Sequence, residues 1–197
     1  MATVLDNVRA LFAPAPAYVI DRETPADVVA RETLLDKVMG ADRKTKSSEK
    51  IRRGRVPAEG LALVARDRAG HVIGTVRLWK IEAGVDRDGN PIEALLLGPL
   101  AVDCAHEGKG IGSALMRAAL LEAKKRDHGA VLLVGDAAYY ERFGFFAYRA
   151  RHLVMPGPFD RARFLGLELK DGWLGGAAGM IVATGRKLSG TSLEQAA

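Results

Sequence analysis

Three glycines within five positions, Gly108, Gly110 and Gly112, follow the apolar run 94–102. That run has the length of a buried strand, and the apolar-rich segment 111–123 is long enough for a helix. A glycine-rich turn between a strand and a helix N-terminus attracts anions. Backbone N–H groups and the positive end of the helix dipole meet there, and glycine lets a phosphate approach the backbone closely. The sequence therefore predicts a phosphate-binding loop.

Two common phosphate motifs do not fit this loop. The P-loop needs Ser or Thr after its lysine, whereas Lys109 is followed by Gly110. The dinucleotide fingerprint needs a third glycine where Ser113 stands. The run Glu107-Gly108-Lys109-Gly110-Ile111-Gly112 instead resembles the pyrophosphate loop of the GNAT (GCN5-related) N-acetyltransferases, Gln/Arg-x-x-Gly-x-Gly/Ala. Glu107 departs from that pattern. Its carboxylate does not suit a pyrophosphate, but its backbone N–H does.

A second motif lies about thirty residues further on. The run Tyr139-Tyr140-Glu141-Arg142-Phe143-Gly144-Phe145 resembles the family signature Tyr-Glu-Lys-x-Gly-Phe. Two matches in the right order are more specific than either alone. The preceding run 135–140 is similar to the YhbS-like branch of the family, and the resemblance is clearest over 94–145.

The resemblance implies the GNAT fold, a mixed α/β domain. Its central mixed sheet has about six to seven strands, helices on both faces, and a splay in the middle that admits CoA. One domain is expected over 17–186, with an N-terminal lead-in at 1–16 and a disordered tail at 187–197. Periodicity and turn residues place the strands and helices, and the glycine-rich segment 173–185 receives no assignment. The expected strands are 17–21, 61–66, 72–81, 94–102, 130–134, 153–155 and 164–169, and the expected helices are 24–40, 48–53 and 110–127.

Membership would make acetyl-CoA the co-substrate, with no metal. The pantetheine arm is an amide chain, so it can hydrogen-bond to a splayed strand at residues 100–102. Pro99 marks that strand as irregular, since proline cannot donate to a ladder. The pyrophosphate would rest on the N–H groups of the glycine loop. The cofactor-binding residues are expected to be Leu100, Ala101, Val102, Glu107, Gly108, Lys109, Gly110, Ile111, Gly112, Ser113 and Tyr140.

The resemblance also implies catalytic roles. The N–H of Val102 would stabilise the oxyanion, and Tyr140 would protonate the departing thiolate. An ordinary phenol has a pKa near 10, so the rate should fall as Tyr140 ionises at high pH. The family's fourth-strand glutamate is replaced by Leu96, which leaves Glu93 as a weak candidate for the base. Cys104 near His106 offers a covalent alternative, which direct transfer does not need.

The expected function is transfer of an acetyl group from acetyl-CoA to a primary amine of a small molecule or peptide. Two alternatives stay open. One is an acyltransferase that uses an acyl-carrier protein or a longer acyl-CoA, and the other is an inactive CoA-binding regulatory module. The basic segment 43–55 would be a docking patch for an acidic acceptor or carrier, or simply a solvated helix face.

Composition limits the remaining possibilities. The net charge of +5 suits anionic ligands but does not by itself indicate nucleic acid, and none is expected as a partner. No segment has the length and apolarity of a membrane span, and we expect no signal peptide from residues 1–12. A single cysteine fits a reducing compartment, so a cytoplasmic monomer or homodimer is expected.

Overall fold

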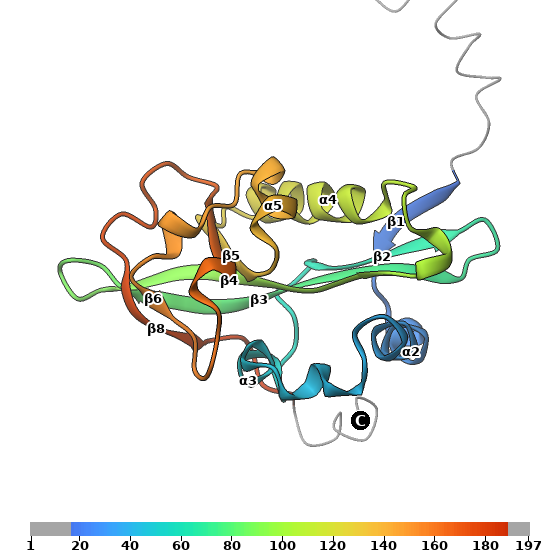
Figure 1. The fold of residues 1–197 in the computed structure, drawn as a ribbon, viewed down its shortest axis with the longest axis horizontal. Coiled ribbons are helices and arrows are strands. Elements are labelled where there is room, and N and C mark those ends of the chain that lie inside the picture. Colours follow the sequence, from blue (N-terminus) through green and yellow to red (C-terminus); the bar gives the residue numbers. More distant parts are fainter. Residues whose placement is uncertain (1–16, 189–197) are drawn as a thin grey trace, which may run out of the picture.

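A computed structural model describes residues 17–188 of the chain (Figure 1). The expected lead-in 1–16 lies outside the described residues, as does most of the expected tail. The strands are β1 (Tyr18–Arg22), β2 (Ala62–Asp67), β3 (Val72–Val85), β4 (Pro91–Val102), β5 (Ala130–Val134), β6 (Leu153–Val154), β7 (Phe164–Glu168) and β8 (Ala178–Ala183). The helices are α2 (Val28–Met39), α3 (Ser47–Arg52), α4 (Ile111–Lys125) and α5 (Ala137–Tyr140). Short 3-10 turns are η1 (Pro25–Asp27), η2 (Ala41–Thr45), η3 (Cys104–His106), η4 (Glu141–Phe143), η5 (Ala147–Ala150) and η6 (Arg161–Arg163).

The strands of residues 17–188 form one mixed sheet of eight, in the order β1-β2-β3-β4-β5-β7, with β8 pairing with β3 and β6. β4 and β5 run parallel, as expected for the short apolar strand 130–134. The long strand β3 pairs with β4 along its length, with β2 at its start and with β8 at its end. Helices α4 and α5 cover one face, and α2 and α3 lie on the other (Figure 1). The mixed α/β architecture expected from the sequence is confirmed.

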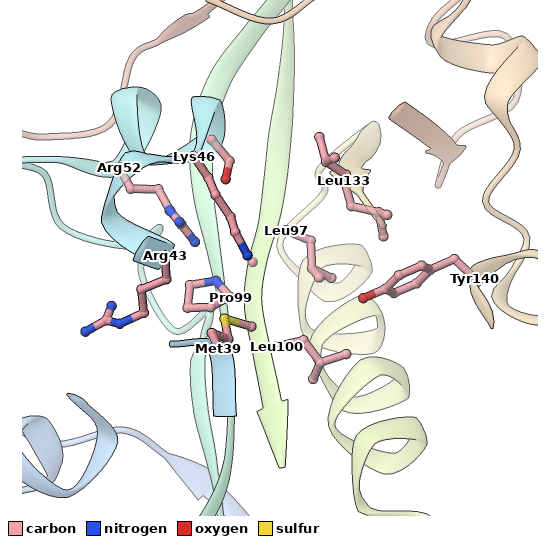
Figure 2. Close-up of a pocket in the computed structure, with 12 residues that line it drawn as sticks. Met39, Arg43, Lys46, Arg52, Leu97, Pro99, Leu100, Leu133 and Tyr140 are labelled. Atoms are coloured by element: carbon pink, nitrogen blue, oxygen red, sulfur yellow. The ribbon is translucent and has the colours of Figure 1, made fainter. Parts of the chain in front are cut away.

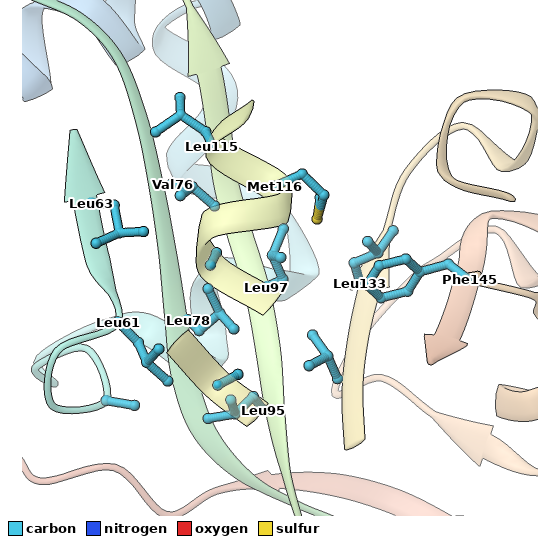
Figure 3. Close-up of a cluster of buried hydrophobic side chains, with 14 of the residues drawn as sticks. Leu61, Leu63, Val76, Leu78, Leu95, Leu97, Leu115, Met116, Leu133 and Phe145 are labelled. Carbon is cyan, nitrogen blue, oxygen red and sulfur yellow. The ribbon is translucent and has the colours of Figure 1, made fainter. Parts of the chain in front are cut away.

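Side chains that alternate along the central strands build a core on each face of the sheet. Leu95 and Leu97 of β4 belong to the cluster under α4, whereas Leu96 belongs to the cluster on the opposite face. The same alternation runs along β5. In Figure 3, Leu115 and Met116 of α4 lie over the strands of the first cluster, and both are fully buried. The apolar stretch of β4 and the all-apolar strand β5 therefore hold the sheet between two covered faces.

Helix α2 faces the sheet with a different set of residues from those that its apolar pattern predicts. The sequence favours Val28, Val29, Thr33, Leu34 and Val38 as the buried face, but among these only Leu34 is fully buried, and Val29 is 78% exposed. The buried face instead consists of Arg31, Leu34 and Leu35. The guanidinium of Arg31 pairs with the carboxylates of Glu23 and Glu32, and this pairing lets an arginine occupy a core position.

The glycine-rich segment 173–185 contains a strand that the sequence analysis did not assign. Strand β8 pairs antiparallel with the end of β3 and parallel with β6. The chain then stays attached beyond the expected domain end at 186. Lys187 forms a bridge with Arg55, and the N–H of Leu188 donates to the carbonyl of Gly54 (2.9 Å). Within residues 17–188, no helix is long and apolar enough to cross a membrane.

We expect Leu115→Ala to lower the free energy of unfolding by about 2–5 kcal/mol, because it removes buried methyl groups and leaves a cavity under α4. The matched control is Leu121→Ala on the same helix, where the leucine is 55% exposed. That change should cost well under 1 kcal/mol. Urea unfolding of both variants measures the difference, and equal losses would contradict the burial of this helix face.

Candidate functional site

The centre of the sheet is open where two parallel strands separate. Strands β4 and β5 pair only at Leu95 with Val131 and at Leu96 with Leu132, although β4 continues to Val102. The remaining length of β4 therefore keeps a backbone edge that β5 does not cover. The splay expected in the middle of the sheet begins directly after Leu96.

A bulge in β4 marks the start of this opening. The register with β3 pairs Val76 with Leu100 and Leu78 with Leu97, so β4 carries one extra residue between them, at Gly98 and Pro99. The indole N–H of Trp79 on β3 donates to the carbonyl of Gly98 (2.6 Å). The irregularity expected at Pro99 is therefore present, and a side chain of the neighbouring strand holds it in place.

Backbone direction decides which residues of β4 serve the opening. The N–H of Asp103 donates to the carbonyl of Ile73 on β3 (2.9 Å). Because N–H groups alternate along a strand, those of Val102 and Leu100 point to the other edge, toward the opening. Ala101 points back to β3, where it pairs with Thr75, and its side chain is buried. The expectation that the backbone of Ala101 contacts the cofactor is therefore wrong. The backbone N–H groups of Leu100 and Val102 point toward the opening, as that expectation requires.

The glycine loop ends at the first turn of α4, beside the outer end of the opening. Gly108 and Gly110 have positive φ angles (74° and 76°), and a Cβ built on either would meet no atom within 4 Å. The first intrahelical bond runs from the N–H of Ala114 to the carbonyl of Gly110 (3.0 Å). The N–H groups of Ile111, Gly112 and Ser113 precede that bond and are left for a ligand. The loop thus offers open space and free donors at a helix N-terminus.

Two loop residues differ from their expected roles. The N–H of Glu107 donates to the carbonyl of Cys104 (3.3 Å), so it is engaged within the chain and is not free for a phosphate. The ammonium of Lys109 donates to the carbonyl of Ala105 (3.3 Å) and does not line the loop's hollow. Both groups therefore turn back onto the turn that precedes the loop, and the Lys109 ammonium does not face the space above the glycines.

A cationic side chain beside the glycine loop comes from the second motif. A hollow over the glycine loop, here called the outer hollow, is lined by Val102, His106, the loop, Tyr139 and Arg142. The guanidinium of Arg142 lies over the ring of Tyr139, with its carbon 3.9 Å from the ring centroid. The Nδ1 of His106 is buried and has no hydrogen-bond partner among the described residues. Sequence reasoning missed Arg142, although it stands within the quoted motif, and it considered His106 only as a neighbour of Cys104.

Tyr140 lies at the inner end of the opening. Asp136 caps α5 by accepting the N–H of Ala138 (3.2 Å), and this short helix carries the tyrosine. Figure 2 shows its hydroxyl directed at Leu97 and Leu100 of β4. The ring packs edge-on against Phe145, with centroids 6.1 Å apart. The hydroxyl is thus aimed at the exposed edge of β4.

Burial raises the pKa of Tyr140 to about 12, and the neighbouring hydroxyl of Tyr139 adds to the rise. The phenol therefore keeps its proton up to about pH 11. An ordinary phenol would cause the rate to fall near pH 10. For Tyr140 the same fall is expected about two pH units higher. Tyr140 is consequently fully protonated over the whole neutral range.

Basic side chains occupy the side of β4 that lies opposite Tyr140. A hollow here called the inner hollow lies between η2, α3, β4 and Tyr140, and Arg43, Lys46 and Arg52 line it together with Pro99 and Leu100 (Figure 2). Arg43 is buried, and the side chain of Arg52 is only 11% exposed. The interpretation of segment 43–55 as a solvated helix face is therefore wrong for these two arginines.

Glu93 is not brought into this arrangement. It is exposed and lines a separate hollow with Trp173, whose indole N–H donates to the Glu93 carbonyl (2.7 Å). Nine residues of strand, or roughly 30 Å, separate Glu93 from Val102. Cys104 is exposed beside His106. Within residues 17–188, no group of three or more His, Cys, Asp or Glu side chains is placed to hold a metal ion.

A splayed parallel strand pair, with a glycine loop at one end and a tyrosine at the other, defines a GNAT N-acetyltransferase, and the chain belongs to this family. The family model described as an acetyltransferase (GNAT) domain matches residues 58–146. The chain is 30% identical over 159 residues to YhbS of Escherichia coli (strain K12), an uncharacterized N-acetyltransferase, covering 81% of this chain and 92% of YhbS.

Two solved structures extend the comparison. YhbS from Escherichia coli in complex with CoA has a TM-score of 0.72 and 29% identity, over 87% of this chain and 92% of that one. A GNAT family acetyltransferase from Brucella melitensis in complex with acetyl-CoA shares the fold, with a TM-score of 0.57 and 24% identity over 77% of this chain and 87% of that one. The family expected from the two motifs is confirmed.

The ring of Tyr140 can occupy its position because residue 135 is a glycine and has no side chain. A Cβ built on Gly135 would lie 2.1 Å from a ring carbon of Tyr140. We expect Gly135→Ala to cost about 1–3 kcal/mol of unfolding free energy, because the ring must move. In a Tyr140→Ala background the same change should cost much less. Urea unfolding of the four proteins measures this coupling, and equal costs in both backgrounds would show that the ring is not the obstacle.

Proposed function

We propose that this acyl-CoA-dependent N-acetyltransferase binds acetyl-CoA along the open edge of β4 and transfers the acetyl group directly to a primary amine. One observation carries the proposal. Val102 lines the outer hollow and Leu100 lines the inner one, so a single strand edge joins the glycine loop to Tyr140. The pantetheine arm would pair with Leu100 and Val102 like another strand, and the pyrophosphate would lie on the first N–H groups of α4.

Acetyl-CoA supplies an activated acyl group as a thioester, and the residues of this chain do the rest. The N–H of Val102 donates to the thioester oxygen while the amine nitrogen bonds to the carbonyl carbon. One such donor is typically worth about 3 kcal/mol in the transition state. Tyr140 gives its proton to the sulfur as the carbon–sulfur bond breaks. The proton released by the amine passes to water, from which Tyr140 is reprotonated.

The outer hollow supports the phosphate end of this proposal. Arg142 stands beside the glycine loop and takes the place expected for Lys109. A planar guanidinium matches phosphate oxygens with paired donors, so Arg142 suits a pyrophosphate better than a single ammonium does. Glu107 remains exposed, and its carboxylate can turn to solvent.

Two further proposals rest on the sequence. The protein acts in the cytoplasm, which is consistent with its single exposed cysteine. It acts as a monomer or a homodimer on a small-molecule or peptide amine, without nucleic acid. An acylated carrier protein stays the alternative donor. A comparison of transfer from acetyl-CoA and from an acylated carrier separates the two donors.

We expect CoA and acetyl-CoA to raise the Tm of the protein, while NAD and ATP raise it far less. Ligand at a hundred times its Kd adds about 2.7 kcal/mol to folding stability. Gly110→Asp should abolish the shift, since it puts bulk and negative charge where the phosphates would lie. Thermal unfolding with each ligand is the measurement. A shift with NAD or ATP and none with CoA would refute the proposed cofactor.

We expect Tyr140→Phe to lower kcat by about 10²–10⁴ with little change in CoA affinity, because the ring stays and the proton donor is lost. The matched control is Tyr148→Phe, an exposed tyrosine stacked on Phe146 outside both hollows, which should be near wild type. Since the pKa of Tyr140 is raised to about 12, the wild-type rate should show no loss from its ionisation below about pH 11. A variant with near-full kcat would assign Tyr140 to packing alone.

A further inference from the structure

The face of β4 away from Tyr140 carries a second concave region, which adjoins the inner hollow. This region, here called the arginine hollow, has a volume of about 310 Å³ and shares Arg43, Arg52 and Pro99 with the inner hollow. Arg77, Trp79 and Glu49 also line it. It therefore opens beside the bulge in β4, next to the strand edge along which the thioester would lie.

Arg52 is one of the three residues that line both hollows. Its side chain is 11% exposed, and its guanidinium lies close to Gly98, since a Cβ built there would be 3.8 Å from Nη1. Nη2 pairs with a carboxylate oxygen of Glu49 (3.0 Å). Nε is buried and has no hydrogen-bond partner among the described residues. A buried guanidinium donor without a partner carries an energetic penalty, and a ligand oxygen would remove it once the side chain turns this donor toward one of the two hollows.

The acidic side chains of the arginine hollow are already engaged. Glu32 pairs with Arg31 and Arg43, and Glu49 pairs with Arg52. Burial lowers the pKa of Arg52, and the charges of Arg43 and Arg77 lower it further, against the opposing effect of Glu49. Glu49 acts on Arg52 more strongly than either of these arginines does. Among the described residues, however, seven Arg and Lys side chains and two carboxylates line the arginine hollow, so its lining carries an excess of positive charge. Among the residues that the structure describes, no carboxylate lines the inner hollow, whereas Arg43, Lys46 and Arg52 all line it.

This charge decides which amines can approach. A simple amine or polyamine is a cation at neutral pH, and a positively charged hollow repels it. An amine that carries its own oxyanion would instead be drawn in by that group. The planar fork of an arginine matches the paired oxygens of a carboxylate or phosphate.

We propose that Arg52 binds an oxyanion group of the acceptor, so that the substrate is an amine bearing a carboxylate or a phosphate, such as an amino acid or a peptide with a nearby carboxylate. This inference rests on the proposed function, because it concerns the acceptor side of the same site. With the oxyanion on Arg52, the amine of the acceptor points past Pro99 toward the edge of β4 and the hydroxyl of Tyr140. Arg52 is then a specificity-determining residue.

The test uses product analogues on the full-length protein saturated with CoA, so that the glycine loop is occupied before the probe is added. N-acetylglycine is compared with the neutral N-acetylglycinamide, and N-acetyl-O-phosphoethanolamine with N-acetylethanolamine. Binding is followed by calorimetry at low salt for wild type, Arg52→Gln and Arg52→Lys. Lys50→Gln is the matched control, because it removes the same charge from the same helix at an exposed position outside both hollows.

We expect at least one charged probe to bind about tenfold or more tightly than its neutral partner, since hydrogen bonds to charged groups are worth that much. Arg52→Gln should abolish this preference, Arg52→Lys should restore part of it, and Lys50→Gln should keep it. A preference within the glycine pair would identify the oxyanion as a carboxylate, and a preference within the ethanolamine pair would identify it as a phosphate.

Equal binding of charged and neutral probes, no binding of any probe at millimolar concentration, or an unchanged preference in Arg52→Gln would each overturn the inference. The CoA-induced rise in Tm, measured on every variant, reports folding and cofactor binding separately. If CoA does not raise the Tm of the wild type, the proposed cofactor is refuted. If CoA raises the Tm but the probes give one of the results above, the acceptor inference alone is refuted.

Discussion

The separation of β4 from β5 is the constraint on which the rest of the structure depends. A central strand that lacks one neighbouring strand exposes polar backbone groups. Its other hydrogen bonds and its side-chain packing must therefore stabilise it. Here β3 pairs with β4 along its length, and the indole of Trp79 fixes the carbonyl at the bulge. Both faces of the sheet remain covered, which leaves only the backbone edge of β4 open. The opening is therefore stable because its cost is confined to a few N–H and C=O groups.

Arginine side chains lie at both ends of this opening, and each lines a different hollow. Arg142 stands over the glycine loop at the outer end, where a helix N-terminus already favours an anion. Arg52 stands at the inner end, held by Glu49 and packed beside the bulge. Since the two arginines lie on opposite faces of the sheet, one anion cannot neutralise both. This arrangement fits a reaction with two anionic substrates that meet at a single strand edge.

Local sequence predicts the loop and the tyrosine well, because both depend on neighbours in the chain. Glycines with positive φ and a capped helix leave signals within a few residues. The buried face of α2 could not be read in this way, because Arg31 enters the core only through its pairing with Glu23 and Glu32. The glycines of segment 173–185 concealed strand β8, since its strand character comes from pairing with β3. Arg52 looked like surface charge because its burial depends on the distant strand β4.

The family's glutamate position on β4 holds no carboxylate, and the charges of the hollows offer a physical substitute. The family position is taken by Leu96, which is buried in the core cluster on the α3 side and leaves no carboxylate there to accept the amine's proton. An ammonium held near like charges loses its proton more readily, because those charges disfavour the charged form. With an oxyanion of the acceptor on Arg52, Lys46 remains to act on the amine, and Figure 2 shows its side chain extending toward β4. In the proposed complex water takes the proton without a dedicated base, so the charge of Lys46 prepares for attack the acceptor that Arg52 selects.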